Sequence, residues 1–204
     1  MPPATTILLI RHGRTDGVDR YLAGRAAGTP LNDQGTIEVA RLTERLRGTR
    51  LAAVVSSTLE RTRQTAEAIA AAHGLPVIED EAFNEFDIGA WTGAAFTTLD
   101  ADGEWARFNA ARSLTGAPGG ELMREVQQRA VTAILALARR YEGGTVAVVS
   151  HGDVIRAILM YFLGMPIEMV HRIEIDPSRV SILEIGRDAV RVQQVNGDAA
   201  SLPA

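Results

Sequence analysis

The sequence predicts an α/β fold, a three-layer α/β/α sandwich with a mostly parallel central sheet. The first observation is a pair of apolar runs, Ile7-Leu8-Leu9-Ile10 and the stretch 145–149, which is aliphatic after Thr145; such runs are typical of strands buried on both faces. The second is the helical spacing of apolar residues between the expected strands. The third is the alternation of β-branched residues over 180–195, which indicates strands near a sheet edge. A chain of 204 residues is long enough to form one sizeable core, and we expect a single domain over residues 1–204.

The first half of the chain alternates strands with helices. After the strand at 7–10, residues 14–31 are rich in glycine and arginine and are expected to form a long loop, a feature that is often functional. Side chains that can cap a helix precede each of the two helical stretches. The expected elements are a helix from Asn32 or Asp33 to about 47, a strand at 51–55, a helix at 59–72 capped by residues 56–58 and ended by His73 and Gly74, and a strand at 75–78.

The second half begins with an irregular stretch. Residues 79–120 contain many glycines, so we expect loops and short helices that cover one side of a site. The expected elements that follow are an amphipathic helix at 121–141, a strand at 145–149, a helix at 153–163 ended by Gly164 and Pro166, edge strands at 171–176, 180–185 and 190–195, and a flexible tail at 196–204.

Composition excludes several classes of function. The net charge of −4 argues against a nucleic-acid partner. The chain has no cysteine and no lysine, since all 21 basic residues are arginine, which excludes disulfides, thiolate-bound zinc, a Walker-type phosphate loop and a Schiff-base lysine. The apolar stretch at 154–163 contains Arg156 and is too short to span a bilayer. With no cationic leader at the start, we expect a cytoplasmic protein without a membrane partner.

Two histidines stand at equivalent places in the predicted sheet. His12 follows the strand at 7–10, within Arg11-His12-Gly13, and His151 follows the strand at 145–149, within Ser150-His151-Gly152. If both strands lie centrally in one parallel sheet, both imidazoles emerge at the same edge, where open α/β sheets bind ligands. The alternative is coincidence, in which case His12 is simply a loop residue after a core strand.

Cations accompany these histidines. Arg11 adjoins His12, and Arg61 lies one turn into the helix that follows the second strand, so its helix begins at the same edge. Guanidinium groups and helix N-termini both favour anions. Together with two imidazoles they would hold a phosphate-sized dianion. One imidazole could attack phosphorus to form a phosphohistidine while the cations offset charge on the phosphoryl oxygens.

The same motifs resemble those of the histidine phosphatase superfamily, the phosphoglycerate mutase-like family. Five stretches match in the family's order, from about residue 7 to residue 185. They are Arg11-His12-Gly13 with Thr15; Arg61, Gln64, Thr65 and Ala66 within 57–66; Phe83-Asn84-Glu85 with Gly89, Trp91 and Gly93; Pro118-Gly119-Gly120-Glu121; and Ser150-His151-Gly152.

This resemblance implies specific roles. His12 would be the nucleophile that becomes phosphorylated, Arg11, Arg61 and His151 would bind the transferring phosphoryl group, and Glu85 would protonate the leaving alcohol and then activate water. The family needs no metal, so no metal site and no cofactor are expected. The candidate residues for binding phosphate or substrate are Arg11, Thr15, Gly24, Arg25, Arg61, His151 and Gly152.

Several of these residues also have a purely structural interpretation. Arg61 could be a solvated helix residue, and Glu85 lies in an acidic run whose members are mostly solvated. Arg25 could guide an anionic substrate or face water. His73 is interpreted as a helix-end residue and His171 as a strand or edge residue. Trp91 and Trp105 are interpreted as packing residues.

The expected function is hydrolysis of a small phosphorylated metabolite. The mutase branch of the family usually has Glu-Arg-x-Tyr-Gly around the acid and lysines that hold the carboxylate, whereas here the stretch is Glu85-Phe86-Asp87-Ile88-Gly89 and lysine is absent. A mutase and a relative that binds phosphorylated ligands without turnover are the alternatives. Val18, Gly28 and Leu122 depart from the family pattern. The physiological ester is left open, and a homodimer through the late strands is the oligomer considered.

Overall fold

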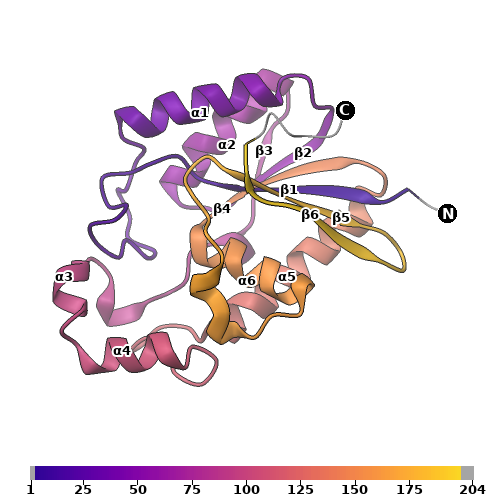
Figure 1. The fold of residues 1–204 in the computed structure, drawn as a ribbon. Helices are drawn as coiled ribbons and strands as arrows, with labels where there is room; N and C mark the ends of the chain where they lie inside the picture. Colours follow the sequence, from indigo (N-terminus) through magenta and orange to yellow (C-terminus); the bar gives the residue numbers. More distant parts are fainter. Residues whose placement is uncertain (1–2, 199–204) are drawn as a thin grey trace.

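The computed structural model describes residues 3–198, which form a six-stranded sheet between two pairs of helices (Figure 1). The elements in chain order are β1 (Thr5–Arg11), α1 (Asp33–Leu46), β2 (Leu51–Ser56), α2 (Glu60–His73), β3 (Val77–Glu79), η1 (Glu81–Phe83), η2 (Gly89–Trp91), α3 (Phe96–Leu99), α4 (Gly103–Ala110), α5 (Met123–Arg140), β4 (Thr145–Ser150), α6 (Gly152–Leu163), η3 (Ile167–Arg172), β5 (Val180–Ile185) and β6 (Val190–Gly197).

The sheet has the order β3-β2-β4-β1-β5-β6. The first four of these strands are mutually parallel, and β5 and β6 add antiparallel pairings at one side. The strands β1 and β4 are therefore central neighbours, as the sequence predicts. Their register pairs Arg11 with Ser150, so His12 and His151 leave the sheet side by side.

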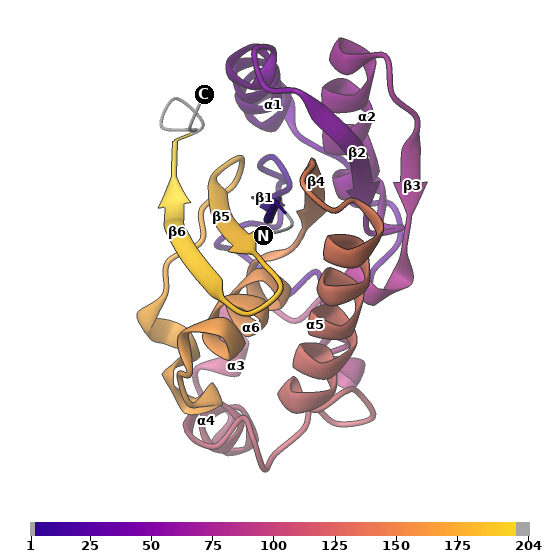
Figure 2. The ribbon, with the colours of Figure 1, turned by 90° about the vertical axis from the view of Figure 1, so that its right-hand side faces the viewer.

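Alternate residues of β1 serve the two faces of the sheet. Leu8 and Ile10 pack with residues of α1 and α2, while Ile7 and Leu9 pack with residues of α5 and α6. Figure 2 looks at the edges of these layers, with α1 and α2 on one side of the strands and α5 and α6 on the other. The predicted three-layer α/β/α architecture is confirmed.

The expected strand at 171–176 is wrong. The chain forms the 3-10 helix η3 up to Arg172 and continues irregularly through residue 176. Ile173 and Ile175 are buried, which explains the alternating pattern, but their carbonyl groups accept hydrogen bonds from Arg156 and Arg11 instead of joining a sheet ladder. An apolar alternation can therefore mark a segment that lines a site rather than a strand.

The C-terminal strand is longer than expected. β6 continues through Asn196 to Gly197, where the sequence suggested the start of a flexible tail. Residues 199–204 of that expected tail lie outside the described residues. No helix within residues 3–198 has both the length and the apolar character needed to cross a bilayer.

Short helices form a cover over the sheet edge, as the glycine-rich composition predicts. The elements η1, η2, α3 and α4 lie between β3 and α5, and Figure 1 shows α3 and α4 set apart from the sheet. Trp91, Trp105 and Phe108 contact one another with ring centroids 5.2 to 5.5 Å apart. Trp91 and Phe108 belong to the same hydrophobic core as Ile7 and Leu9, so the aromatic cluster joins the cover to the main core.

Candidate active site

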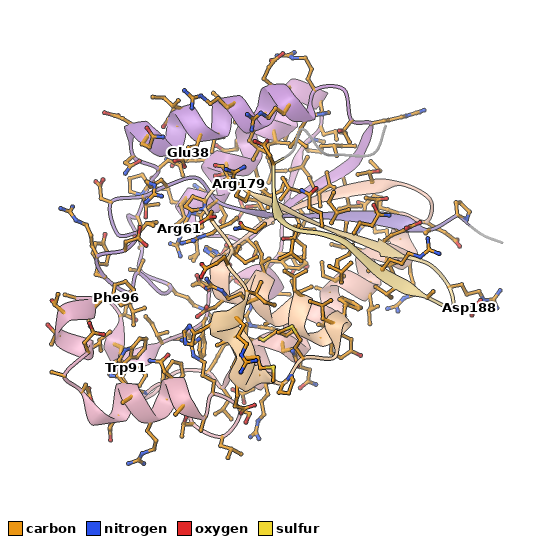
Figure 3. The ribbon with its side chains drawn as sticks, in the orientation of Figure 1. Glu38, Arg61, Trp91, Phe96, Arg179 and Asp188 are labelled. Atoms are coloured by element: carbon orange, nitrogen blue, oxygen red, sulfur yellow. The ribbon has the colours of Figure 1, made fainter. Side chains whose placement is uncertain are left out.

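A cavity of about 310 Å³ lies at the carboxyl ends of β1 and β4. Seven of the predicted site residues line it: Arg11, His12, Thr15, Gly24, Arg61, Glu85 and Gly152. His151 is not among the lining residues and lies behind His12, with the two ring centroids 5.2 Å apart. Figure 3 shows Arg61 on the sheet side, with Phe96 and Trp91 on the side of the cover. The cavity is therefore bounded by the carboxyl ends of the strands and by the cover.

His12 presents one ring nitrogen as a free base. Its Nδ1 lies 2.7 Å from the carbonyl oxygen of Gly13, and because a carbonyl only accepts, Nδ1 carries the proton. Nε2 therefore keeps its lone pair, towards which the Arg61 Nε–H donates at 3.2 Å. Burial, together with the charges of Arg61 and Arg11, lowers the pKa of His12 well below its usual value. The imidazole is thus neutral and nucleophilic near neutral pH.

His151 is fully buried, and its ring forms a hydrogen bond with the Ser57 hydroxyl. Its Nε2 lies 2.8 Å from Ser57 Oγ, which also contacts Thr62 Oγ1 at 2.9 Å. Nδ1 has no hydrogen-bond partner among residues 3–198 and lies 3.9 Å from Glu85 Oε2. Burial, and then the charge of Arg61, lowers the pKa of His151. Nδ1 is thus the ring nitrogen on the Glu85 side, although His151 itself does not line the cavity.

The role of Ser57 corrects one local prediction. Residues 56–58 were expected to cap the helix that became α2, but its N-cap is Leu59, without a side-chain hydrogen bond. The Ser57 hydroxyl accepts the N–H of Leu59 at 3.3 Å, before the first turn, and lies closer to Nε2 of His151, at 2.8 Å. A serine that precedes a helix can therefore form a hydrogen bond with a residue that follows a neighbouring strand, here His151 after β4.

Arg11 and Arg61 are fixed by main-chain carbonyl groups. Arg11 Nη1 donates to Ile175 at 2.6 Å, and Arg61 Nη2 donates to Gly24 at 2.8 Å. Arg11 Nε and Arg61 Nη1 are buried and have no partner within residues 3–198. Burial lowers the pKa of both guanidinium groups, but an arginine stays protonated in proteins. Buried donors of this kind are prepared for an anion.

Glu85 lies in the loop between η1 and η2, and its Oε1 accepts the Phe86 N–H at 2.9 Å. Burial raises the pKa of Glu85, and the negative charge of Asp153 raises it further, while Arg61 opposes the increase. A carboxyl group with a raised pKa can donate a proton near neutral pH. The other acids of the run at 79–87 do not line the cavity.

Four charged residues that the sequence motifs do not single out also line the cavity: Asp19, Arg112, Asp153 and Arg156. Asp153 accepts hydrogen bonds from Arg112 Nη1 and Arg156 Nη1, both at 3.0 Å. Although burial acts to raise the pKa of Asp153, Arg112 and Arg156 lower it to about 2. Asp153 follows the Ser-His-Gly motif directly, which is a signal that could have identified it. Arg112 belongs to the irregular region and has no such signal.

The remaining predicted binding residues have different positions. Thr15 is buried in the cavity wall, and Gly152 begins α6, whose N-terminal end faces the cavity. Gly24 contributes its carbonyl to Arg61. Arg25 does not line the cavity, because its guanidinium binds Glu121 Oε2 at 2.9 Å and the main-chain carbonyl of Glu85 at 2.8 Å.

Some residues that were interpreted as structural do reach the cavity. His171 lines it, with Nε2 3.1 Å from Asn109 Oδ1, and Trp105 lines it while stacking on Phe108. Val18, one of the departures from the family pattern, contributes an apolar side chain there. His73 ends α2, as predicted, and its ring nitrogens lie 2.9 and 3.0 Å from two main-chain carbonyl oxygens.

No group of three or more histidine, cysteine, aspartate or glutamate side chains in the described part of the chain is arranged to hold a metal ion. The anion-binding charges described above all come from arginine.

Comparison with known proteins identifies the family. The profile described as "Histidine phosphatase superfamily (branch 1)" matches residues 7–198. A protein of Mycobacterium tuberculosis named "Bifunctional protein Rv2228c" is 36% identical over 197 residues, which is 94% of this chain and 54% of that protein. The chain therefore spans about half the length of this mycobacterial relative.

Two further proteins cover most of the chain. "Probable phosphoglycerate mutase GpmB" of Salmonella choleraesuis is 29% identical over 181 residues, which is 87% of this chain and 84% of that protein. A crystal structure from Escherichia coli, described as that of a candidate alpha-ribazole-5'-P phosphatase, is 25% identical with a TM-score of 0.87. It covers 98% of this chain, and this chain covers all of it.

Proposed function

The chain belongs to the histidine phosphatase superfamily, and from that membership we propose that it hydrolyses phosphomonoesters of small metabolites through a phosphohistidine on His12. One observation carries the proposal. The unprotonated Nε2 of His12 lies in a cavity that Arg11, Arg61 and Glu85 also line, and the buried ring of His151 contacts His12 and lies 3.9 Å from Glu85. This arrangement supplies a nucleophile, anion-binding groups and an acid within one small volume.

In the first step, the lone pair of His12 Nε2 attacks phosphorus and the bond from phosphorus to the ester oxygen breaks. Arg11 and Arg61 offset the negative charge on the phosphoryl oxygens, and His151 Nδ1 faces the same group. The departing oxygen takes the proton of Glu85 and leaves as an alcohol, because an alkoxide is a poor leaving group near neutral pH. The products of this step are phosphohistidine and a free alcohol.

In the second step, water attacks the phosphorus and the bond to His12 Nε2 breaks. The Glu85 carboxylate, ionised by the first step, takes a proton from the attacking water. Inorganic phosphate leaves, and His12 regains its lone pair while Glu85 regains its proton. Every group is then in its starting state.

The charge of the cavity wall supports an anionic metabolite as the substrate. Beyond the arginines that would hold the phosphoryl group, Arg112 and Arg156 also line the cavity, opposed by Asp153 and by Asp19. A wall with excess positive charge raises the local concentration of anions. The volume of about 310 Å³ lies within the range of small-molecule sites.

The mutase is the second candidate, because a similar Salmonella protein carries that name. A mutase must keep water away from phosphohistidine and retain the intermediate. We favour hydrolysis because the stretch Glu85-Phe86-Asp87 departs from the mutase pattern and the chain has no lysine to hold a substrate carboxylate.

One experiment separates these functions. Purified protein is mixed with 3-phosphoglycerate and a trace of the bisphosphate, and both free phosphate and 2-phosphoglycerate are measured. If the protein is a phosphatase, free phosphate appears with the unmodified protein and does not appear with the His12→Ala variant. Rapid formation of 2-phosphoglycerate without phosphate would establish the mutase, and binding without either product across a panel of esters would establish a non-catalytic relative.

A further inference from the structure

Two arginines from distant segments converge on the main-chain carbonyl group of Glu85. Arg25 Nε donates to this oxygen at 2.8 Å, and Arg129 Nη2 donates at 3.3 Å. Arg25 belongs to the loop before α1, and Arg129 belongs to α5. Arg129 Nη1 also donates to the carbonyl of Ala82 at 2.7 Å. The loop that carries Glu85 is therefore held by hydrogen bonds to two of its main-chain carbonyl groups, those of Ala82 and Glu85.

Glu121 holds these two arginines together. Its Oε2 accepts from Arg25 Nη2 at 2.9 Å and from Arg129 Nη2 at 3.0 Å, and its Oε1 accepts from Arg129 Nε at 2.9 Å. Oε2 also accepts the Asp87 N–H at 3.0 Å, so the same carboxylate binds the loop two residues beyond Glu85. Without this negative charge, two neighbouring guanidinium groups would repel each other.

The glycines before Glu121 allow the two loops to pack closely. A Cβ on Gly120 would lie 2.1 Å from the Asp87 carbonyl oxygen, and a Cβ on Gly89 would lie 2.1 Å from that of Pro118. The Glu121 N–H donates to Asp87 at 2.9 Å and the Ala90 N–H donates to Pro118 at 2.9 Å. Backbone packing and the charged network therefore fix the same loop.

We propose that Glu121 is a positioning residue for Glu85: it aligns Arg25 and Arg129 on the Glu85 carbonyl and so fixes where the carboxyl group meets the leaving oxygen. This inference rests on the proposed function, in which Glu85 is the acid. It gives a role to the Pro-Gly-Gly-Glu motif and to Arg25, neither of which touches the cavity.

The test compares esters that differ in their need for an acid. Glycerol 3-phosphate has an alkyl leaving group that must be protonated, whereas nitrophenolate leaves without help. The ratio kcat/KM reports the steps through alcohol release. For Glu121→Gln we expect kcat/KM for glycerol 3-phosphate to fall about ten- to hundredfold, the scale for a misplaced catalytic group. The value for nitrophenyl phosphate should change little, and Glu121→Asp should recover part of the loss.

Glu125→Gln is the matched control. Glu125 lies four residues after Glu121, accepts the Leu122 N–H at the start of α5 and does not contact the loop that carries Glu85. Its replacement by glutamine removes the same charge as Glu121→Gln does. It should retain the kcat/KM of the unmodified protein for both esters. If Glu121→Gln folds poorly, Arg25→Lys takes its place. Lysine keeps the charge but cannot bind Glu121 and the Glu85 carbonyl together, so this variant should also slow glycerol 3-phosphate more than nitrophenyl phosphate.

A double variant makes the outcome decisive. In a Glu85→Gln background, Glu121→Gln should cause no further fall for glycerol 3-phosphate, because it acts through Glu85. Equal slowing of both esters, or a full further fall in that background, would overturn the positioning role and leave the proposed function intact. If Glu85→Gln itself slowed both esters equally, the acid role in the proposed function would fail instead.

Discussion

The imidazole rings of His12 and His151 meet edge to face, with centroids 5.2 Å apart and planes inclined at 61°. The residues are far apart in the sequence, but β1 and β4 are hydrogen-bonded neighbours, and the His12 N–H donates to the Ser150 carbonyl at 3.1 Å. The sheet register thus fixes the pair. Because the pKa of each ring is lowered, the pair can stay neutral at this short separation.

His12 should carry the phosphoryl group during turnover. Reaction with a radiolabelled phosphomonoester followed by rapid quenching should yield an acid-labile phosphohistidine on His12, since Nε2 carries no proton. Peptide mapping of the quenched protein locates the label. His12→Ala should show neither label nor turnover, whereas His73→Gln, which alters a helix-end histidine outside the cavity, should keep both. Label on any other residue would refute the assigned nucleophile.

Glu85→Gln should slow alkyl esters far more than nitrophenyl esters. Removing a general acid costs about 10²- to 10⁴-fold where the leaving group needs a proton. The measurement is kcat/KM for both esters. Glu81→Gln, a neighbouring acid on the exposed side of η1, provides the comparison and should leave both values unchanged. Equal slowing of the two esters by Glu85→Gln would argue against the acid role.

Asp153→Asn should move the alkaline limb of the pH profile to lower pH. The protonated form of Glu85 is the active acid, so kcat/KM for an alkyl ester falls as pH rises through the pKa of Glu85. Asp153 contributes to the raised pKa of Glu85, and removing its charge therefore lowers that pKa. The profile is measured with glycerol 3-phosphate, with Asp100→Asn as the exposed control. An unmoved or upward-shifted limb in Asp153→Asn would contradict this electrostatic coupling.

Gly120→Ala should destabilise the fold. The new Cβ would meet the Asp87 carbonyl oxygen at 2.1 Å, which forces the loops apart and should lower the free energy of unfolding by about 1–3 kcal/mol. Urea denaturation followed by circular dichroism gives this value. Gly103→Ala, at the open start of α4, has nothing within 4 Å of its added Cβ and should not lose stability. Matching unfolding midpoints for the two variants would show that the loops can relax.

Local patterns predicted most of the fold because strands and helices with buried faces have distinct periods. The runs at 7–10 and 145–149 became β1 and β4, and Gly74 and Gly164 end their helices in the left-handed conformation. The strand predicted at 171–176 is wrong, because the carbonyl groups of Ile173 and Ile175 accept hydrogen bonds from arginine side chains and not from a neighbouring strand. Such partners come from distant segments and leave no local signal.

The amino-acid pattern is enough to predict the sheet class, the two histidines at strand ends and the family whose motifs surround them. The polar contacts become visible only in the folded chain: Ser57 with His151, Arg112 with Asp153, and Arg25 and Arg129 with Glu121. They could not be predicted because periodicity records only which faces are buried. Hydrogen bonds and charges act over a few ångströms, and the pairs that come within that range are set by the packing of segments remote in the chain.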